Sequence, residues 1–155
     1  MAAYQQNGSC NPHTPQSSPC RQGNYVEYTI EVHNAADVAA GMGFAQAKNI
    51  RLVIKNTGHE YVIVICRRKR RLTRYSYLGK STGKGALSLW MHKLKSINIA
   101  NFTSEAYTGP AVKMGAGVQA FEAYTAAHDA GLTVLGGQCI TVGIAGGYTQ
   151  GGGHS

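Results

Sequence analysis

The apolar and polar positions in the first third of the chain predict a strand, a helix and a second strand in direct succession. Residues 25–32 are β-branched and aromatic and partly alternate, which is typical of a strand. Asn34 is placed to cap a helix that runs to about Lys48. Its apolar positions recur at helical spacing and are Val38, Met42 and Ala45. The apolar run 50–54 predicts the next strand, so the segment forms a βαβ unit whose strands we expect to be parallel.

The pattern continues less regularly in the second half of the chain. Two short apolar runs, 86–90 and 111–114, predict strands, and a helix then ends before Gly131. The expected apolar face of this helix consists of Val118, Phe121, Tyr124 and His128. Residues 132–135 predict one more strand, and the Gly-rich segment from Gly136 onward is not expected to be regular throughout. The sequence thus predicts an α+β class of α/β-like character, with βαβ units and a mixed sheet.

Two segments lie outside this pattern. Residues 1–23 are polar and rich in Pro, Ser and Gln, which predicts an N-terminal loop segment ahead of a domain over 24–155. Residues 62–77 begin with a dense β-prone run and continue with six basic residues and no acid. This segment is open to two interpretations, a surface hairpin with a charged tip and an insert that is foreign to the domain.

Charge and apolar content exclude some classes of partner. The formal net charge is +8, but without the segment 62–77 it is +2. A nucleic-acid-binding function is therefore the least favoured hypothesis, since the charge lacks interleaved aromatic residues. No apolar run is long enough to span a bilayer, so no membrane partner is predicted. The first residues lack the features of a signal peptide, and localisation is left unassigned.

The cysteines show no zinc pattern, because no CxxC occurs. Cys10 and Cys20 flank a short loop and can form a local disulfide. Cys139 lies in a Gly-dense stretch, 136–154, whose backbone N–H groups can approach an anion and favour a thiolate. A flexible tail with an inert thiol is the alternative interpretation of this stretch.

A histidine follows the strand predicted at 50–54. The turn 54–59 is polar, contains a glycine and ends at His59, at the carboxyl end of a strand where ligand sites of α/β domains tend to lie. An imidazole there can act as a nucleophile, a metal ligand or a base. A surface histidine that stabilises the loop is the alternative.

Together these stretches resemble the berberine-bridge-enzyme-like group of the vanillyl-alcohol-oxidase superfamily, and most closely its fungal members with a PCMH-type FAD-binding domain. The motifs that carry the resemblance are residues 10–20, 23–26, 36–38, 49–59, 79–83, 86–90, 109–113, 115–118, 139–143 and 151–155. The resemblance implies the N-terminal part of such a domain, incomplete at its C-terminal side. One departure is Ile140, where the family often has proline.

The resemblance also implies a site. In the family, a histidine bonds to the 8α-methyl carbon of FAD and a cysteine bonds to flavin C6, which implies bicovalent FAD through His59 and Cys139. The residues implied to line the pyrophosphate and the ring are Asn56, Thr57, Gly58, Gly79, Ser81, Thr82, Gly143, Gly146, Gly147 and Gly152. No metal is implied.

The implied activity is flavin-dependent oxidation of an alcohol, sugar or amine with O₂ as acceptor. The implied partners are FAD and, in full-length members, a small-molecule substrate. Since the family's catalytic base and substrate domain come from later sequence, we expect a truncated fragment, with an inactive remnant that binds little or no flavin as the alternative. Residues 62–77 interrupt a segment that family members run almost continuously, and we interpret them as a translated, unspliced intron.

Overall fold

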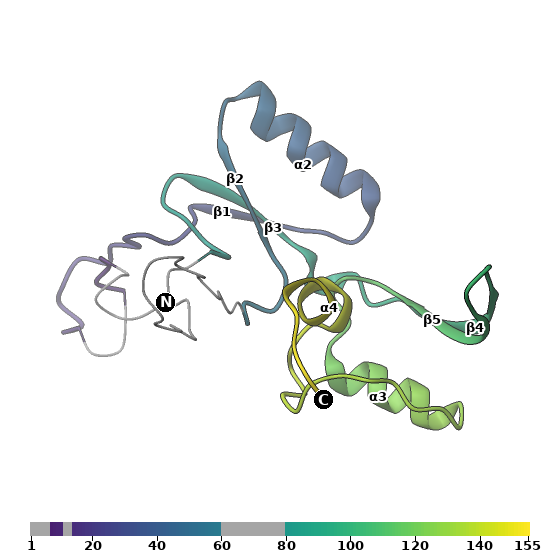
Figure 1. Cartoon of the computed structure of the whole chain (residues 1–155). Helices are drawn as coiled ribbons and strands as arrows, with labels where there is room; N and C mark the ends of the chain where they lie inside the picture. Colours follow the sequence, from purple (N-terminus) through teal and green to yellow (C-terminus); the bar gives the residue numbers. More distant parts are fainter. Residues whose placement is uncertain (1–6, 11–13, 60–79) are drawn as a thin grey trace, which may run out of the picture.

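The fold is built around a small parallel sheet that carries one helix on one face, with a hairpin and further helical segments beyond it (Figure 1). The computed structural model describes residues 7–10, 14–59 and 80–155. The possible insert at 62–77 lies outside the described residues, so both interpretations of it stay open, as does the domain division.

The parallel sheet consists of β1 (Tyr28–Glu31), β2 (Arg51–Lys55) and β3 (Ala86–Trp90). The three strands predicted at these places are confirmed. However, β1 and β2 do not pair with each other, because each pairs in parallel with β3, which lies between them. The later part of the chain therefore completes the sheet that the first βαβ unit begins.

Helix α2 (Ala35–Ala47) begins with the predicted cap. The Asn34 side chain accepts hydrogen bonds from the backbone N–H groups of Ala36 and Asp37, at 2.8 and 3.1 Å. The Asp37 carboxylate in turn accepts from the backbone N–H of Asn34 at 3.2 Å, which closes a capping box. Two of the donors that a helix N-terminus leaves unpaired are satisfied in this way.

The face of α2 that meets the sheet differs from the predicted one. Ala45 is buried as expected, but Met42 is 52% exposed, and Gly41 lies against the sheet instead. A Cβ atom on Gly41 would lie 2.5 Å from Cδ2 of the fully buried Leu89. The helix thus approaches β3 through a residue without a side chain. A search for apolar residues at helical spacing does not detect such a contact.

The second half of the chain adds an antiparallel hairpin to the parallel sheet. A short 3₁₀ turn, η1 (Met91–Lys93), leads to β4 (Ile97–Thr103), which pairs with β5 (Thr108–Met114). The strand predicted at 111–114 is confirmed as the end of β5, whereas β4 was not predicted. The α+β class is confirmed, but the predicted mixed sheet is wrong, because the parallel and antiparallel strands form two separate sheets.

Helix α3 (Ala120–Asp129) ends as predicted, since Gly131 adopts a φ of +68° beyond its last turn. Its buried positions are Ala120, Ala123 and Ala127. Of the predicted face, Val118 is fully buried and Tyr124 packs against the core, whereas Phe121 is 44% exposed and His128 is exposed too. Ala120 and Ala123 face inward, where they form a buried cluster with Val118 and Ile144.

The strand predicted at 132–135 is wrong. These residues form coil, and Leu135 is 77% exposed. The chain then forms a π-helical turn, η2 (Ile144–Tyr148), and a single α-helical turn, α4 (Thr149–Gly151). An apolar run without a neighbouring strand edge has no partner for its backbone, so composition alone does not make it a strand.

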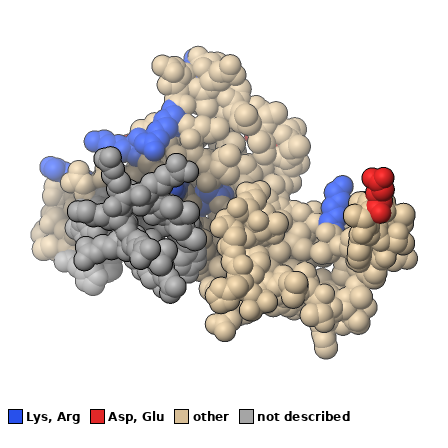
Figure 2. Space-filling view, in the orientation of Figure 1, with Lys and Arg blue, Asp and Glu red and all other residues tan. Residues whose placement is uncertain are grey.

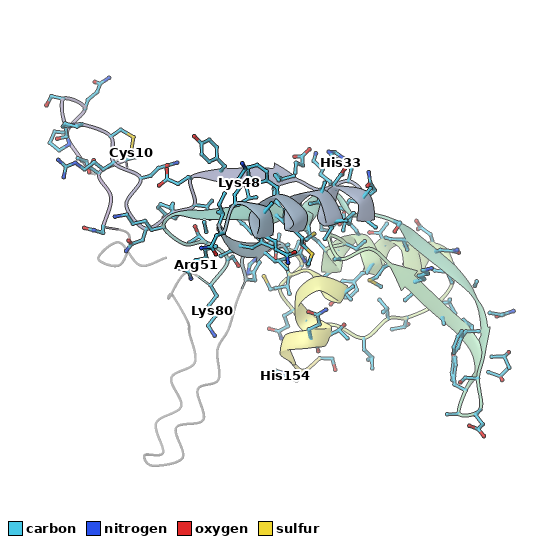
Figure 3. The ribbon with its side chains drawn as sticks, turned by 90° about the horizontal axis from the view of Figure 1, so that it is seen from above. Cys10, His33, Lys48, Arg51, Lys80 and His154 are labelled. Carbon is cyan, nitrogen blue, oxygen red and sulfur yellow. A yellow bond between two sulfur atoms is a disulfide. The ribbon has the colours of Figure 1, made fainter. Side chains whose placement is uncertain are left out.

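The N-terminal loop is closed by a disulfide. Cys10 and Cys20 are bonded, as the sequence allowed, with their Cα atoms 4.7 Å apart. The backbone N–H of Ser9 also donates to the carbonyl of Arg21 at 2.9 Å. Figure 3 shows this loop at the opposite end of the molecule from the β4–β5 hairpin.

An ion pair joins the segment before β4 to α3. The Lys95 ammonium lies 2.6 Å from the Glu122 carboxylate, which also accepts from the backbone N–H of Gln119 at 2.8 Å. Burial alone would raise the pKa of Glu122, but the hydrogen bonds from Gln119 and Lys95, with the positive charges of Lys95 and His92, bring this pKa below its ordinary value. The ionised form of Glu122 is therefore the one that the fold favours.

The contrast between two glycines of α2 tests the close approach to β3. We expect Gly41→Ala to lower the free energy of unfolding by about 1–3 kcal/mol, because the new methyl group displaces the buried Leu89. Gly43, two residues on, has no atom within 4 Å of a Cβ. Gly43→Ala should raise stability by up to about 1 kcal/mol through helix propensity. Urea denaturation of both variants measures the difference, and equal effects would contradict the packing.

The Glu122 ion pair predicts a pH dependence of stability. Since the folded pKa lies below the unfolded one, its stabilisation is complete well above pH 4.5 and is lost as the pH falls through the folded pKa. The difference in unfolding free energy between wild type and Glu122→Gln should therefore be largest near neutral pH and should shrink below 4.5. Denaturation at a series of pH values measures it, with Glu105→Gln as the control. A difference that stays constant with pH would exclude a role for the charge.

Candidate functional site

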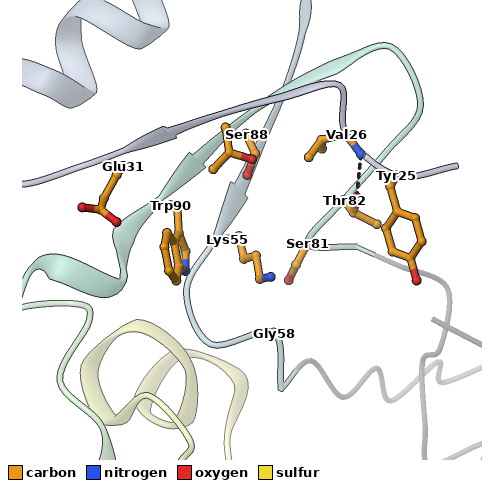
Figure 4. A pocket seen from close by; sticks show the side chains of 10 residues that line it. Tyr25, Val26, Glu31, Lys55, Gly58, Ser81, Thr82, Ser88 and Trp90 are labelled. Carbon is orange, nitrogen blue, oxygen red and sulfur yellow. Dashed lines mark hydrogen bonds between the residues drawn. The ribbon is translucent and has the colours of Figure 1, made fainter. Parts of the chain in front are cut away.

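The face of the parallel sheet opposite α2 lines a pocket of about 610 Å³ (Figure 4). Leu89 contacts α2, so its neighbours Ser88 and Trp90 point to the other face of the strand. The strand register sets Ser88 beside Thr29, and Trp90 between Glu31 and Lys55. The lining residues are Tyr25, Val26, Thr29, Glu31, Lys55, Gly58, Ser81, Thr82, Ser88 and Trp90.

The pocket combines a positive charge, hydroxyl groups and an aromatic ring. In Figure 4 the Lys55 ammonium and the Ser81 hydroxyl point toward the same space. The Thr82 hydroxyl accepts from the backbone N–H of Val26 at 2.9 Å, which ties the segment before β3 to the chain entering β1. The indole N–H of Trp90 donates to the carbonyl of Asn56 at 3.0 Å and so holds its ring beside the turn after β2.

Two buried side-chain oxygens lie near this pocket without a hydrogen-bond partner among the described residues. They are Oγ of Ser88, which lines the pocket and is 1% exposed, and Oδ1 of Asn56 in the turn after β2. Buried polar atoms are normally paired, because an unpaired one loses its bond to water without replacement. Ser88 therefore gives the pocket floor an unused hydrogen-bonding group.

His59 and Cys139 meet at a third side chain. Nε2 of His59 lies 3.0 Å from the hydroxyl oxygen of Thr141, although the two residues are separated by 82 positions. Sγ of Cys139 lies 3.6 Å from the same oxygen. The structure thus brings the two predicted attachment residues together at one edge, next to the pocket that Gly58 lines.

Helix α3 holds the loop that carries Cys139. Its first backbone N–H groups donate to loop carbonyls, with Ala120 bonded to Val142 at 2.9 Å and Phe121 bonded to Ile140 at 3.0 Å. The Gln119 side chain also donates to the carbonyl of Thr141 at 2.9 Å. The donors left over at the helix N-terminus are thereby used to fix the loop.

The loop in turn changes the acidity of the thiol. The side-chain hydrogen bond from Thr141, followed by backbone hydrogen bonds from Thr141 and Val142, lowers the pKa of Cys139 below its ordinary value. Cys139 is exposed, and it is the free cysteine among the described residues. A thiol with a lowered pKa and free access is a stronger nucleophile near neutral pH than an ordinary one.

The turn after β2 packs into the Gly-rich segment. The Asn56 side chain donates to the carbonyl of Ala116 at 2.7 Å. A Cβ on Gly143 would overlap Nδ2 of Asn56, and one on Gly146 would lie 2.6 Å from it. These two glycines leave room for Asn56, which is a packing reason for their presence beside the lining role that the resemblance implies.

Two relatives and a solved structure match nearly the whole chain. It is 56% identical over 151 residues to the VAO-type flavoprotein oxidase VAO615 of Thermothelomyces thermophilus, which covers 97% of this chain and 24% of that protein. It is 50% identical over 155 residues to the FAD-linked oxidoreductase ZEB1 of Gibberella zeae, covering 100% of this chain and 25% of that protein. The crystal structure of the VAO-type flavoprotein MtVAO615 from Myceliophthora thermophila matches with a TM-score of 0.81 and 55% identity over 95% of this chain and 24% of that chain.

The chain is a homologue of the VAO-type, FAD-linked oxidoreductases. The resemblance and the partial α+β fold are confirmed by these matches. The chain spans about a quarter of the length of these relatives. No family model matches it.

The remaining predicted residues lie in different settings. Gly58, Ser81 and Thr82 line the pocket, and Gly58 adopts a φ of +86°. Thr57, next to Gly58 in the chain, is half-buried. Gly147 and Gly152 face open space. Gly79 lies outside the described residues. The role of each toward a flavin stays a prediction.

Sequence reasoning missed the pocket side chains that come from strands. Ser88 and Trp90 belong to the strand predicted at 86–90 and Lys55 to the polar turn 54–59, and none of the three is among the predicted site residues. The polar residue between two leucines in 86–90 marks the face of β3 that turns away from the helix. Thr141 was also missed. Its position two residues after Cys139 was the available signal.

No group of three potential metal ligands occurs in residues 7–10, 14–59 and 80–155. No helix in those ranges has the length and apolarity to cross a membrane. On the face in Figure 2, basic side chains of the described residues lie in several separate places rather than in one stripe.

Two neighbouring glycines of the π-helical turn, Gly146 and Gly147, allow the packing around Asn56 to be tested. A Cβ on Gly146 would overlap the carbonyl oxygen of Ala116, whereas Gly147 has no atom within 4 Å. We expect Gly146→Ala to lower the free energy of unfolding by about 1–3 kcal/mol. Gly147→Ala should leave it unchanged within about 1 kcal/mol. Thermal and urea denaturation provide the measurement, and a Gly146→Ala variant as stable as wild type would argue against the packing of Asn56.

Proposed function

We propose that this chain is part of the FAD-binding portion of an oxidoreductase that oxidises an alcohol, sugar or amine with O₂ as acceptor. The FAD is bound along the pocket and bonded through His59 and Cys139. The observation that carries the proposal is the meeting of these two side chains at the Thr141 hydroxyl. The homology supports it, because the relative from Gibberella zeae is named an FAD-linked oxidoreductase.

The lining of the pocket suits the phosphates of a dinucleotide. Lys55 offers a positive charge, and the hydroxyls of Ser81 and Thr82 offer hydrogen bonds. Gly58, with its φ of +86°, exposes backbone at the same place. Glu31, the acidic lining residue, lies 3.1 Å from Nε2 of His33.

The buried floor of the pocket offers a further contact. Oγ of Ser88 has no partner in the described residues, and a polar group of the ligand would supply one. The Trp90 ring, fixed by its hydrogen bond to Asn56, offers an aromatic wall beside it. We therefore assign the residues of this face, together with the turn after β2, to binding and orientation of the cofactor.

The two attachment residues differ in the nucleophile they supply. His59 supplies an imidazole nitrogen, and Cys139 supplies a sulfur whose lowered pKa favours the thiolate. Both are exposed, so a ring edge can reach them. When bound, the flavin supplies the capacity to accept a hydride from a substrate C–H bond and to pass the electrons to O₂.

An inactive remnant that binds little or no flavin is the second candidate. The observation in its favour is the exposure of large apolar side chains, with Tyr28 and Leu135 at 77% and Ile54 at 59%. Exposed apolar area of this kind promotes association instead of ligand binding.

Flavin retention after denaturation decides between the two candidates. We expect wild type to keep a fluorescent flavin in a denaturing gel, and both His59→Ala and Cys139→Ala to keep it through the remaining bond. The double variant should lose all of it. His128→Ala, an exposed histidine on α3, is the control and should behave as wild type.

The outcomes separate the parts of the proposal. Flavin that copurifies with the native chain but is released from wild type by denaturation would refute the covalent bonds and leave FAD binding intact. A colourless native chain that remains colourless after addition of FAD would favour the remnant.

A further inference from the structure

The Thr141 hydroxyl contacts both attachment residues but is not itself a nucleophile in the proposed function. Its oxygen lies 3.0 Å from Nε2 of His59 and 3.6 Å from Sγ of Cys139. The backbone of Thr141 is fixed as well, because its carbonyl accepts a hydrogen bond from the side chain of Gln119 at 2.9 Å. Gln119 is the N-cap residue of α3, so this helix helps to position Thr141.

A hydroxyl group has one proton to donate and two neighbours here that can accept it. In one arrangement, Thr141 donates to Nε2 of a neutral His59, and the thiol of Cys139 donates to the Thr141 oxygen. In the other, Thr141 donates to the thiolate, and a protonated Nε2 donates to the Thr141 oxygen. The two arrangements differ by one proton, which leaves sulfur and arrives at Nε2.

We propose that Thr141 is a positioning residue for both attachment side chains, and that its hydroxyl carries the thiol proton from Cys139 to His59. In this step the S–H bond breaks while an O–H bond forms at Thr141, and the original O–H bond of Thr141 breaks while an N–H bond forms at Nε2. No electron is gained or lost. The importance of the step for the cofactor rests on the proposed function, but the step itself requires only this chain.

The surroundings of the thiol agree with this assignment. The groups that act on the acidity of Cys139 are the hydroxyl and backbone of Thr141 and the backbone of Val142. Through Thr141, the ring of His59 is the titratable side chain that faces the sulfur. The lowered pKa of Cys139 has the direction expected when Thr141 donates to the thiolate.

The pH profile of alkylation in the flavin-free chain tests the proposal. Iodoacetamide reacts with the thiolate, and mass spectrometry of the Cys139 peptide reads this site separately from Cys66. We expect Thr141→Val, which removes the hydroxyl at nearly constant volume, to move the midpoint to higher pH. Thr141→Ser keeps a hydroxyl and should restore the wild-type profile.

A matched control comes from the same Gly-rich segment. The Thr149 hydroxyl donates to the carbonyl of Ile144 at 3.0 Å, so Thr149→Val removes a hydroxyl of similar setting that serves only the backbone. It should leave the midpoint unchanged. Circular dichroism of each variant verifies that the fold is retained.

The proton link itself is tested by a double-mutant cycle. His59→Ala removes the acceptor of the thiol proton and should also raise the midpoint. The variant with both Thr141→Val and His59→Ala should shift no further than the larger single effect, because the two residues act through one path. A Thr141→Val profile that superimposes on wild type, a shift that serine does not restore, or additive shifts would each overturn the proposal.

Flavin retention provides the second reading. If the proposed function holds, Thr141→Val should also lose most of the covalent flavin, and Thr141→Ser should recover it. If wild type retains no flavin after denaturation, the proposed attachment fails, while the alkylation profiles still decide the role of Thr141. The two failures are therefore distinguishable.

Discussion

The side chain of Asn56 joins the two parts of the molecule on which the site depends. It reaches from the turn after β2 to the carbonyl of Ala116 and fills the space left by Gly143 and Gly146. This contact fixes the end of the parallel sheet against the Gly-rich segment. It acts together with the hydrogen bond between His59 and Thr141, which joins the same turn to the loop of Cys139.

The loop that bears the thiol depends on a second set of contacts, at the start of α3. Gln119 is bonded to Glu122 within its capping box, Glu122 is paired with Lys95, and the Gln119 side chain holds the Thr141 carbonyl. The segment before the hairpin, the helix and the loop of Cys139 thus share one network. The backbone of Thr141 is thus held by α3, while its hydroxyl contacts both His59 and Cys139.

The pocket follows from the order of strands in the sheet. With β3 between β1 and β2, one row of side chains from three strands faces away from α2 and meets the turn after β2. The row of Glu31, Trp90 and Lys55 is a product of this register. The similarity to the MtVAO615 structure over 95% of this chain shows that the same arrangement forms part of a larger flavoprotein.

The sequence by itself determined the local elements and the residue types of the site. The cap at Asn34, the three parallel strands and the stop at Gly131 follow from short-range patterns, and the motifs around His59 and Cys139 were sufficient to indicate the family. Only the tertiary structure decided which helix face is buried, as at Gly41 and Met42, because a close backbone approach leaves no apolar signal. It also decided that 132–135 remains coil and that Thr141 lies between His59 and Cys139. Both depend on which segments, far apart along the chain, come to lie beside one another, and a local pattern carries no information about that.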